Sequence, residues 1–166
     1  MTYGVENVSV QEAEPADCSS IRQLALDANI DAWSEADYLD EISRQDPFVL
    51  KALYRNKLTG FLVARIVPGT DQRHPDADLY NIGVCPDHKR QGVGTLLLLR
   101  LLETLVEKRV QCLWLEVRES NSEAISFYER HGFKAEVTRP NFYSNPSENA
   151  VIMKLQIRPE RDASEV

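Results

Sequence analysis

The chain has 166 residues, of which 43% are hydrophobic and 27% charged, a composition typical of a folded soluble protein rather than a disordered one. Its net charge of −7 at pH 7 disfavours non-specific binding to nucleic acid, which needs a basic face. The first 46 residues carry 11 acidic and two basic side chains, so the excess negative charge lies in the first quarter of the chain, where a basic partner or substrate is expected.

Apolar periodicity and turn residues predict strands and helices in alternation. A first strand over Val5–Val10 precedes a helical stretch that opens at Pro15, and Ser34 caps the next helix. Later in the chain, Ser120 and Glu123 are predicted to form a capping box. The remaining predicted elements are strands at Phe48–Tyr54, Leu58–Val67 and Leu79–Val84, a helix at Gly92–Lys108, a strand at Cys112–Val117, a helix ending at Gly132, and strands at Phe133–Val137 and Val151–Ile157. This order predicts a mixed α/β sheet with helices on both faces.

No repeat or low-complexity linker divides the sequence, so residues 1–157 are expected to form a single domain, followed by a polar tail over 158–166. Three isolated cysteines, Cys18, Cys85 and Cys112, do not suggest a disulfide framework, and no cysteine or histidine spacing suggests a metal site. The sequence shows neither a signal peptide nor a membrane span. A cytoplasmic protein without a bound metal is therefore expected.

Arg90-Gln91-Gly92-Val93-Gly94-Thr95 lies between a predicted strand and a long predicted helix. Its two glycines allow backbone N–H groups to converge at a helix start, which carries partial positive charge, and Lys89 adds a full charge beside Arg90. The segment is a chemically sensible pyrophosphate site. The alternative is a glycine-rich helix entry with solvated basic residues, because short glycine motifs are common.

The run Asn81–Gly94 resembles the signature of the GNAT acetyltransferases. Leu113–Arg118, Asn121 and Ala124–Phe133 resemble the later motif of the same family. The resemblance extends from about Val8 to Ile157. Within the family it narrows to the RimI-type branch, which acetylates the amino terminus of a ribosomal protein; the segments that carry this are Trp33-Ser34, Leu113–Arg118, Arg139–Tyr143 and Ala150–Met153.

The resemblance implies the GNAT acyltransferase fold, with about seven strands, and acetyl-CoA as the acetyl donor. It assigns the donor's pyrophosphate to Arg90, Gln91, Gly92, Val93, Gly94 and Thr95, and its pantetheine arm to the backbone of Ile82, Gly83 and Val84. A backbone N–H near Val84 would polarise the thioester carbonyl. Asn121 and Tyr128 are also implied to contact the donor, and the position of Asn121 suits a helix cap as well.

Glu116 is the candidate general base, because a carboxylate in an otherwise apolar strand is costly without a purpose. An ion pair between Glu116 and Arg118 is the alternative. The resemblance makes Tyr128 the general acid that protonates the departing thiolate, although its spacing from Ala124 and Phe127 also suits a core aromatic residue.

On the acceptor side, the resemblance implies that Trp33, Asn141, Phe142 and Tyr143 contact the peptide. A core position for Trp33 is equally compatible with its sequence, and Pro140 is expected to stiffen a loop over Arg139–Tyr143. Cys85 replaces the acidic residue common before Pro86. It is treated as a small buried residue, since only His88 offers a base nearby for an acetyl-carrier role.

The sequence therefore predicts an enzyme that acetylates the N-terminal α-amine of a protein by direct attack in a ternary complex. The expected acceptor is a basic ribosomal protein with a small first residue. Two alternatives remain: a GNAT enzyme for a small cationic amine such as a polyamine or aminoglycoside, and a non-catalytic CoA-binding adaptor.

Overall fold

A computed structural model of the chain describes residues 5–31, 33–70 and 73–157. Seven strands form one sheet in the order β1-β2-β3-β4-β5-β7-β6, in which β4 and β5 pair in parallel and β1–β2, β2–β3, β5–β7 and β6–β7 pair antiparallel. The predicted mixed α/β sheet is thus confirmed. The elements are β1 (Val8–Glu12), α1 (Cys18–Asp27), α2 (Glu35–Ile42), β2 (Phe48–Tyr54), β3 (Lys57–Val67), β4 (Asp76–Val84), α3 (Val93–Glu107), β5 (Cys112–Arg118), α4 (Ser122–Arg130), β6 (Lys134–Ser144) and β7 (Ser147–Gln156), with short 3-10 turns at Val5–Asn7, Pro15–Asp17 and Pro86–His88.

The chain divides into two compact units. The first contains the elements up to Arg65 together with Tyr80–Thr104, and the second contains Ile66–Leu79 and the elements from Leu105 onward. The end of β4 belongs to the first unit and its beginning to the second.

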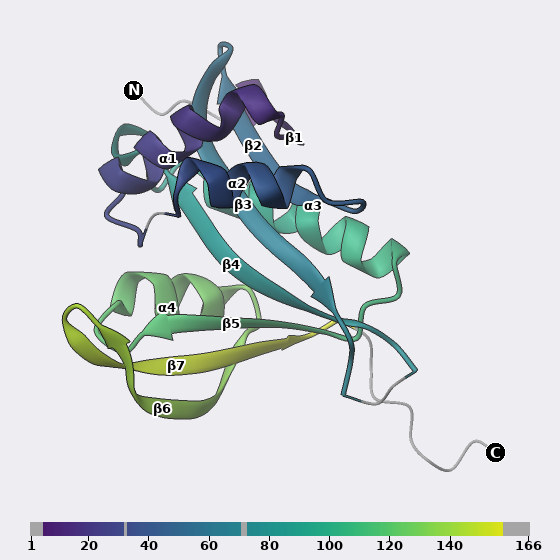
Figure 1. The fold of residues 1–166 in the computed structure, drawn as a ribbon, viewed down its shortest axis with the longest axis vertical. Helices are drawn as coiled ribbons and strands as arrows, with labels where there is room; N and C mark the ends of the chain where they lie inside the picture. Colours follow the sequence, from purple (N-terminus) through teal and green to yellow (C-terminus); the bar gives the residue numbers. More distant parts are fainter. Residues whose placement is uncertain (1–4, 32, 71–72, 158–166) are drawn as a thin grey trace. The chain divides into compact units, whose positions relative to one another are not determined.

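In the first unit, helices cover both faces of the strands. Side chains alternate between the two faces of a strand. Phe61 packs in the cluster that contains buried residues of α1 and α2, while a Cβ on the neighbouring Gly60 would meet Val93 and Leu97 of α3. Accordingly, α2 crosses in front of β3 in Figure 1 and α3 lies behind it.

In the second unit, β5 is anchored by a buried carboxylate at the start of β4. Asp76, which is 3% exposed, accepts hydrogen bonds from the Cys112 N–H and from the Trp114 indole N–H, both at 3.2 Å. Leu113, Leu115 and Val117 of β5 are buried, as their alternation predicts. Together these contacts fix which side chains of β5 point away from the core.

The largest error of the sequence-based prediction concerns the closing strands. Instead of strands at Phe133–Val137 and Val151–Ile157, β6 and β7 form a long hairpin that turns at Asn145 and Pro146 (Figure 1). Arg139–Tyr143 is therefore part of β6 and not a loop. The hydrophobicity pattern gave the wrong bounds for this strand because β6 is exposed along almost its whole length. It therefore lacks the alternation of buried and exposed residues that marks a half-buried strand.

The amino-terminal strand is also shifted. β1 begins at Val8, and Val5–Asn7 form a 3-10 turn, so the predicted strand at Val5–Val10 is three residues early at its start. The expectation of a single domain over 1–157 stays a prediction, and the predicted tail over 158–166 lies outside the described residues. Within the described part of the chain, no helix is long and apolar enough to cross a membrane.

Candidate active site

The turn between β4 and α3 is built for exposed backbone N–H groups. Arg90 and Gly92 both adopt positive φ angles, 59° and 86°, and α3 begins immediately afterwards at Val93. The first four N–H groups of a helix have no partner within it, and they carry partial positive charge. Lys89 and Arg90 are exposed beside them. This arrangement has the chemistry required to bind an anion such as a pyrophosphate.

Other members of the predicted cradle shape the turn itself. The Gln91 amide donates to the Asp87 carbonyl at 3.0 Å and closes the turn, while Val93 is buried at 2% exposure. Gly94 and Thr95 are half-buried in the first turn of α3. Arg90 and Gly92 thus bend the backbone toward the helix start, and Val93 anchors that start in the core.

Glycines bring β3, β4 and α3 together. A Cβ on Gly60 of β3 would lie 2.9 Å from Val93 Cγ1 and 3.1 Å from the Gly83 carbonyl oxygen. A Cβ on Gly83 would lie 2.5 Å from Phe61 Cε1. Gly60 was not singled out from the sequence, because nothing in a strand pattern shows which residue another backbone approaches.

The end of β4 carries the predicted pantetheine residues Ile82, Gly83 and Val84. In the described residues, the ladder between β4 and β5 pairs Ala77–Leu79 with Leu113–Leu115 and ends there. Beyond Val84, Cys85 is half-buried, packs against the core cluster that includes Phe61, and donates its N–H to the Thr59 carbonyl at 2.8 Å. These contacts are those of a small structural residue.

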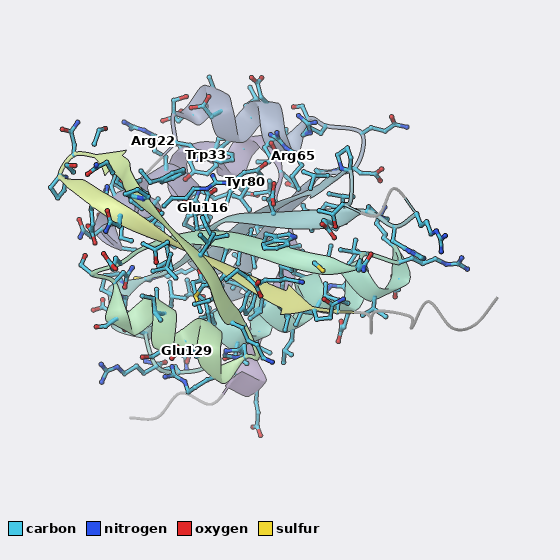
Figure 2. The ribbon with its side chains drawn as sticks, turned by 90° about the horizontal axis from the view of Figure 1, so that it is seen from below. Arg22, Trp33, Arg65, Tyr80, Glu116 and Glu129 are labelled. Carbon is cyan, nitrogen blue, oxygen red and sulfur yellow. The ribbon has the colours of Figure 1, made fainter. Side chains whose placement is uncertain are left out.

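Glu116 points away from the core of the second unit. It lies between the buried residues Leu115 and Val117, and its side chain is 44% exposed (Figure 2). Its carboxylate is 3.5 Å from the Arg139 guanidinium of β6. The predicted alternative, an ion pair between Glu116 and Arg118, is wrong: Arg118 is paired with Glu148 instead. Glu116 is a solvated carboxylate held loosely by one exposed cation.

Tyr128 of α4 is buried at 7% exposure, between the rings of Phe127 and Phe133, each centred 5.4 Å away. It therefore occupies the core position that its helical spacing predicted. Burial, with a smaller contribution from the nearby Tyr143, raises the pKa of the Tyr128 phenol well above that of free tyrosine. The phenol stays protonated at neutral pH and remains able to donate a proton.

Asn121 caps α4. Its side-chain oxygen accepts the Ala124 N–H at 3.1 Å, as the sequence allowed. The predicted capping box of Ser120 and Glu123 is wrong, because the N-cap of α4 is the next residue, Asn121. The Ser120 N–H donates instead to the Glu148 carboxylate at 2.6 Å.

The β6–β7 hairpin carries the predicted acceptor residues Asn141, Phe142 and Tyr143. Asn141 has a φ of 50°, and its N–H donates to the Asn149 side chain at 3.0 Å, within a register shift between Arg139 and Tyr143. Phe142 is 42% exposed. The Tyr143 ring lies under the Arg118 guanidinium, 4.1 Å from ring centre to charge. The register shift thus places the two neighbouring aromatic residues in different environments: Phe142 is exposed, and Tyr143 is covered by Arg118.

Trp33 lies just before α2 and joins an aromatic cluster in the first unit (Figure 2). Its ring stacks on the fully buried Tyr38 and approaches Tyr80, with both centres 5.6 Å away. Arg65 lies 5.2 Å over the Tyr80 ring and forms an ion pair with the buried Glu41. Trp33 is half-buried, so it both contacts the core and presents a surface.

That surface faces a cleft of about 390 Å³ lined by Trp33, Asp37, Asp40, Glu41, Arg44 and Arg65. Glu41 is neutralised by Arg65, and Asp37 is engaged in the predicted cap of α2, accepting from the backbone and hydroxyl of Ser34. Among the residues that the structure describes, Asp40 has neither an ion pair nor a hydrogen bond. The contributions of Arg65 and Tyr80 were missed from the sequence, because they depend on contacts between distant segments.

Groups of three or more histidine, cysteine or acidic side chains able to hold a metal ion are absent from the described residues. The predicted site residues fall into two groups. The cradle and the acidic, aromatic cleft belong to the first unit, and Glu116, Asn121, Tyr128 and the β6–β7 hairpin belong to the second.

Comparison with known proteins gives consistent matches along most of the chain. The sequence profile of the acetyltransferase (GNAT) family matches residues 18–133. The [ribosomal protein bS18]-alanine N-acetyltransferase of Escherichia coli K12 is 33% identical over 152 residues, covering 90% of this chain and 97% of that protein. Its counterpart from Haemophilus influenzae is 36% identical over 147 residues, covering 87% and 95%.

The same likeness is found among solved structures. The crystal structure of the Escherichia coli ribosomal-protein-S18-alanine N-acetyltransferase superposes with a TM-score of 0.78 at 31% identity, covering 94% of this chain and 97% of that one. The expected acyltransferase fold is thereby confirmed.

Proposed function

Because this chain belongs to the acetyltransferase (GNAT) family, we propose that it transfers the acetyl group of acetyl-CoA to the N-terminal α-amine of a protein. The proposed acceptor is a ribosomal protein with a small first residue. The observation that carries this proposal is the identity of 33% with the Escherichia coli bS18-alanine enzyme, which spans 97% of that enzyme and is not confined to one motif. Ribosomal proteins are made in the cytoplasm, and we propose that the enzyme acts there.

The cradle of the first unit is the proposed binding site for the pyrophosphate of the donor. The partial charges at the start of α3, with Lys89 and Arg90, suit a pyrophosphate, and the positive φ angles of Arg90 and Gly92 let the backbone turn toward it. Backbone groups of Ile82, Gly83 and Val84 would pair with the pantetheine amides as an added strand does. A backbone N–H near Val84 would polarise the thioester carbonyl, and Asn121 and Tyr128 would contact the donor.

The chemical step is nucleophilic attack by the neutral amine on the thioester carbonyl in a ternary complex, where a C–N bond forms and the C–S bond breaks. With a pKa near 8, about one-tenth of an α-amine is neutral at pH 7, against about one part in 2,500 for a lysine with a pKa near 10.4. A modest base is therefore enough for an α-amine acceptor.

Glu116 is our candidate for that base, acting through a water molecule, because its carboxylate is solvated and paired only loosely with Arg139. Tyr128 is our candidate for the acid that protonates the departing CoA thiolate. Its phenol is protonated at neutral pH, so a proton is available for the thiolate, and the upward shift of the Tyr128 pKa keeps that proton in place at alkaline pH as well.

The acceptor peptide is proposed to lie against Trp33, Asn141, Phe142 and Tyr143. The unpaired Asp40 in the cleft beside Trp33, and the net charge of −9 over the first 46 residues, favour a basic peptide. The same acidity suits a small cationic amine, which is the second candidate acceptor.

A direct comparison of acceptors tests the proposal. The purified enzyme is incubated with acetyl-CoA and either a basic peptide that begins with alanine or spermidine, and CoA release is followed. We expect a kcat/KM for the peptide at least tenfold above that for spermidine. Acetylation of spermidine with no reaction of the peptide would replace the proposed acceptor by the second candidate.

A further inference from the structure

Glu148 joins three segments of the second unit. It lies near the start of β7, opposite Tyr143 of β6. One carboxylate oxygen accepts the Ser120 N–H at 2.6 Å, just before α4, and the other is 3.4 Å from an Nη of Arg118 at the end of β5. The Glu148 and Arg118 side chains are 17% and 22% exposed, so most of each is covered by protein.

Arg118 uses both the edge and the face of its guanidinium at the hairpin. Along the edge, its Nη atoms donate to the carbonyls of Asn145 and Pro146 at 3.4 and 3.3 Å, where β6 turns into β7. The face covers the Tyr143 ring at 4.1 Å, a cation–π contact. The guanidinium can make both sets of contacts only in a narrow range of orientations, and the Glu148 carboxylate stabilises it there.

Tyr143 is the residue through which this arrangement reaches the site. Its ring lies edge-on to that of Phe142, with the ring centres 5.1 Å apart. It also follows directly after the exposed Phe142, in the segment proposed to contact the acceptor.

We propose that Glu148 is a positioning residue for the acetyl acceptor. By orienting Arg118, Glu148 fixes the β6–β7 hairpin, and Tyr143 is thereby held where it can contact the acceptor molecule. This inference rests on the proposed function for its substrate. The contacts that carry it are contacts within the second unit.

Replacement of Glu148 by glutamine keeps an oxygen that can accept the Ser120 N–H but removes the charge that orients Arg118. Without the Glu148 charge, the Arg118 guanidinium is held less firmly against Tyr143 and the hairpin turn, which lowers the fraction of enzyme that is ready to bind the acceptor. We expect E148Q to raise the acceptor KM about tenfold, and to leave the acetyl-CoA KM within about twofold.

The matched control is E136Q, which makes the same chemical change at an exposed residue of β6. A second variant, R118K, keeps the positive charge but lacks the planar fork, and it should raise the acceptor KM as E148Q does. The double variant E148Q/R118K should raise the acceptor KM little more than either single variant does, because the two residues act as a unit. The KM values are measured with whichever amine the wild-type enzyme acetylates.

Amide hydrogen exchange of the hairpin over Asn141–Ser144 gives a readout that needs no acceptor. We expect faster exchange in E148Q and R118K than in wild type or E136Q. Unchanged exchange, or a KM that rises equally for both substrates, would overturn the positioning role. Acetylation of spermidine alone by the wild-type enzyme would instead reject the proposed function, while the exchange data and the spermidine KM would still decide the role of Glu148.

Discussion

At the scale of single residues, the catalytic proposal depends first on Glu116. In E116Q, the amine must lose its proton without help, so we expect kcat/KM to fall by roughly 10²-fold or more. The deficit should be largest at low pH, where little amine is neutral, and should shrink as the pH rises toward the pKa of the amine. Steady-state rates across neutral and alkaline pH measure this.

The control for this variant is R139Q, which breaks the same exposed ion pair but leaves the carboxylate in place. Because exposed pairs contribute little, R139Q should keep nearly full activity. Unaltered turnover in E116Q would end the assignment of Glu116 as the base.

Tyr128 makes a second prediction at this scale. Removing its hydroxyl in Y128F should lower kcat roughly 10²-fold or more, since the thiolate would depart unprotonated. The pKa of Tyr128 is raised by burial and by Tyr143, so the phenol holds its proton above the ordinary tyrosine pKa of 10.0. Tyr128 should therefore cause no loss of activity as the pH rises toward 10. A full rate in Y128F would show that the thiolate needs no proton from it.

At the scale of secondary-structure elements, caps can be tested directly. Asn121→Ala removes the side-chain acceptor for the Ala124 N–H, and we expect the free energy of unfolding to fall by about 1 kcal/mol. Ser120→Ala, one residue earlier, is the matched control and should change it by less than about 0.5 kcal/mol. Urea unfolding without acetyl-CoA measures both. Equal losses in the two variants would contradict the assignment of Asn121 as the cap.

The elements differ in how well the sequence predicts them, for physical reasons. The bounds of β2 and the cap of α2 at Ser34 were predicted correctly, because apolar alternation and capping chemistry are local signals. The β6–β7 hairpin was missed because β6 is exposed, contains Pro140 and is held by pairing with β7. No local pattern in β6 records that pairing.

In the candidate site, too, the local features were predictable from the sequence and the contacts between distant segments were not. The turn and the helix start over Arg90–Thr95 were predictable, because the glycines and the first residues of the helix are adjacent in the sequence. The partners Glu41–Arg65, Glu116–Arg139 and Arg118–Glu148 were not, since each joins segments that are far apart in the sequence.

At the scale of the whole molecule, the uneven charge is the feature to test. Of the acidic residues in the cleft, Glu41 is held in a buried pair and Asp37 in a helix cap, so neutralising either would disturb the fold. Asp40 offers the clean test. We expect D40N to raise the KM for basic peptides a few-fold, with the effect shrinking at high salt because exposed charges are screened.

The control for D40N is E12Q, which removes one negative charge from the same part of the sequence but outside the cleft. If the acidity acts only through the overall charge, the two variants will raise the KM equally. If D40N leaves the KM unchanged, the acidic face is a solvated surface without a role in acceptor binding.

The proposed function requires that an N-terminal α-amine accepts the acetyl group. A basic peptide that begins with alanine and contains one internal lysine is incubated with the enzyme and acetyl-CoA, and tandem mass spectrometry locates the acetyl group. We expect acetylation of the α-amine and an unmodified lysine. Acetylation of the lysine with a free amino terminus would contradict it.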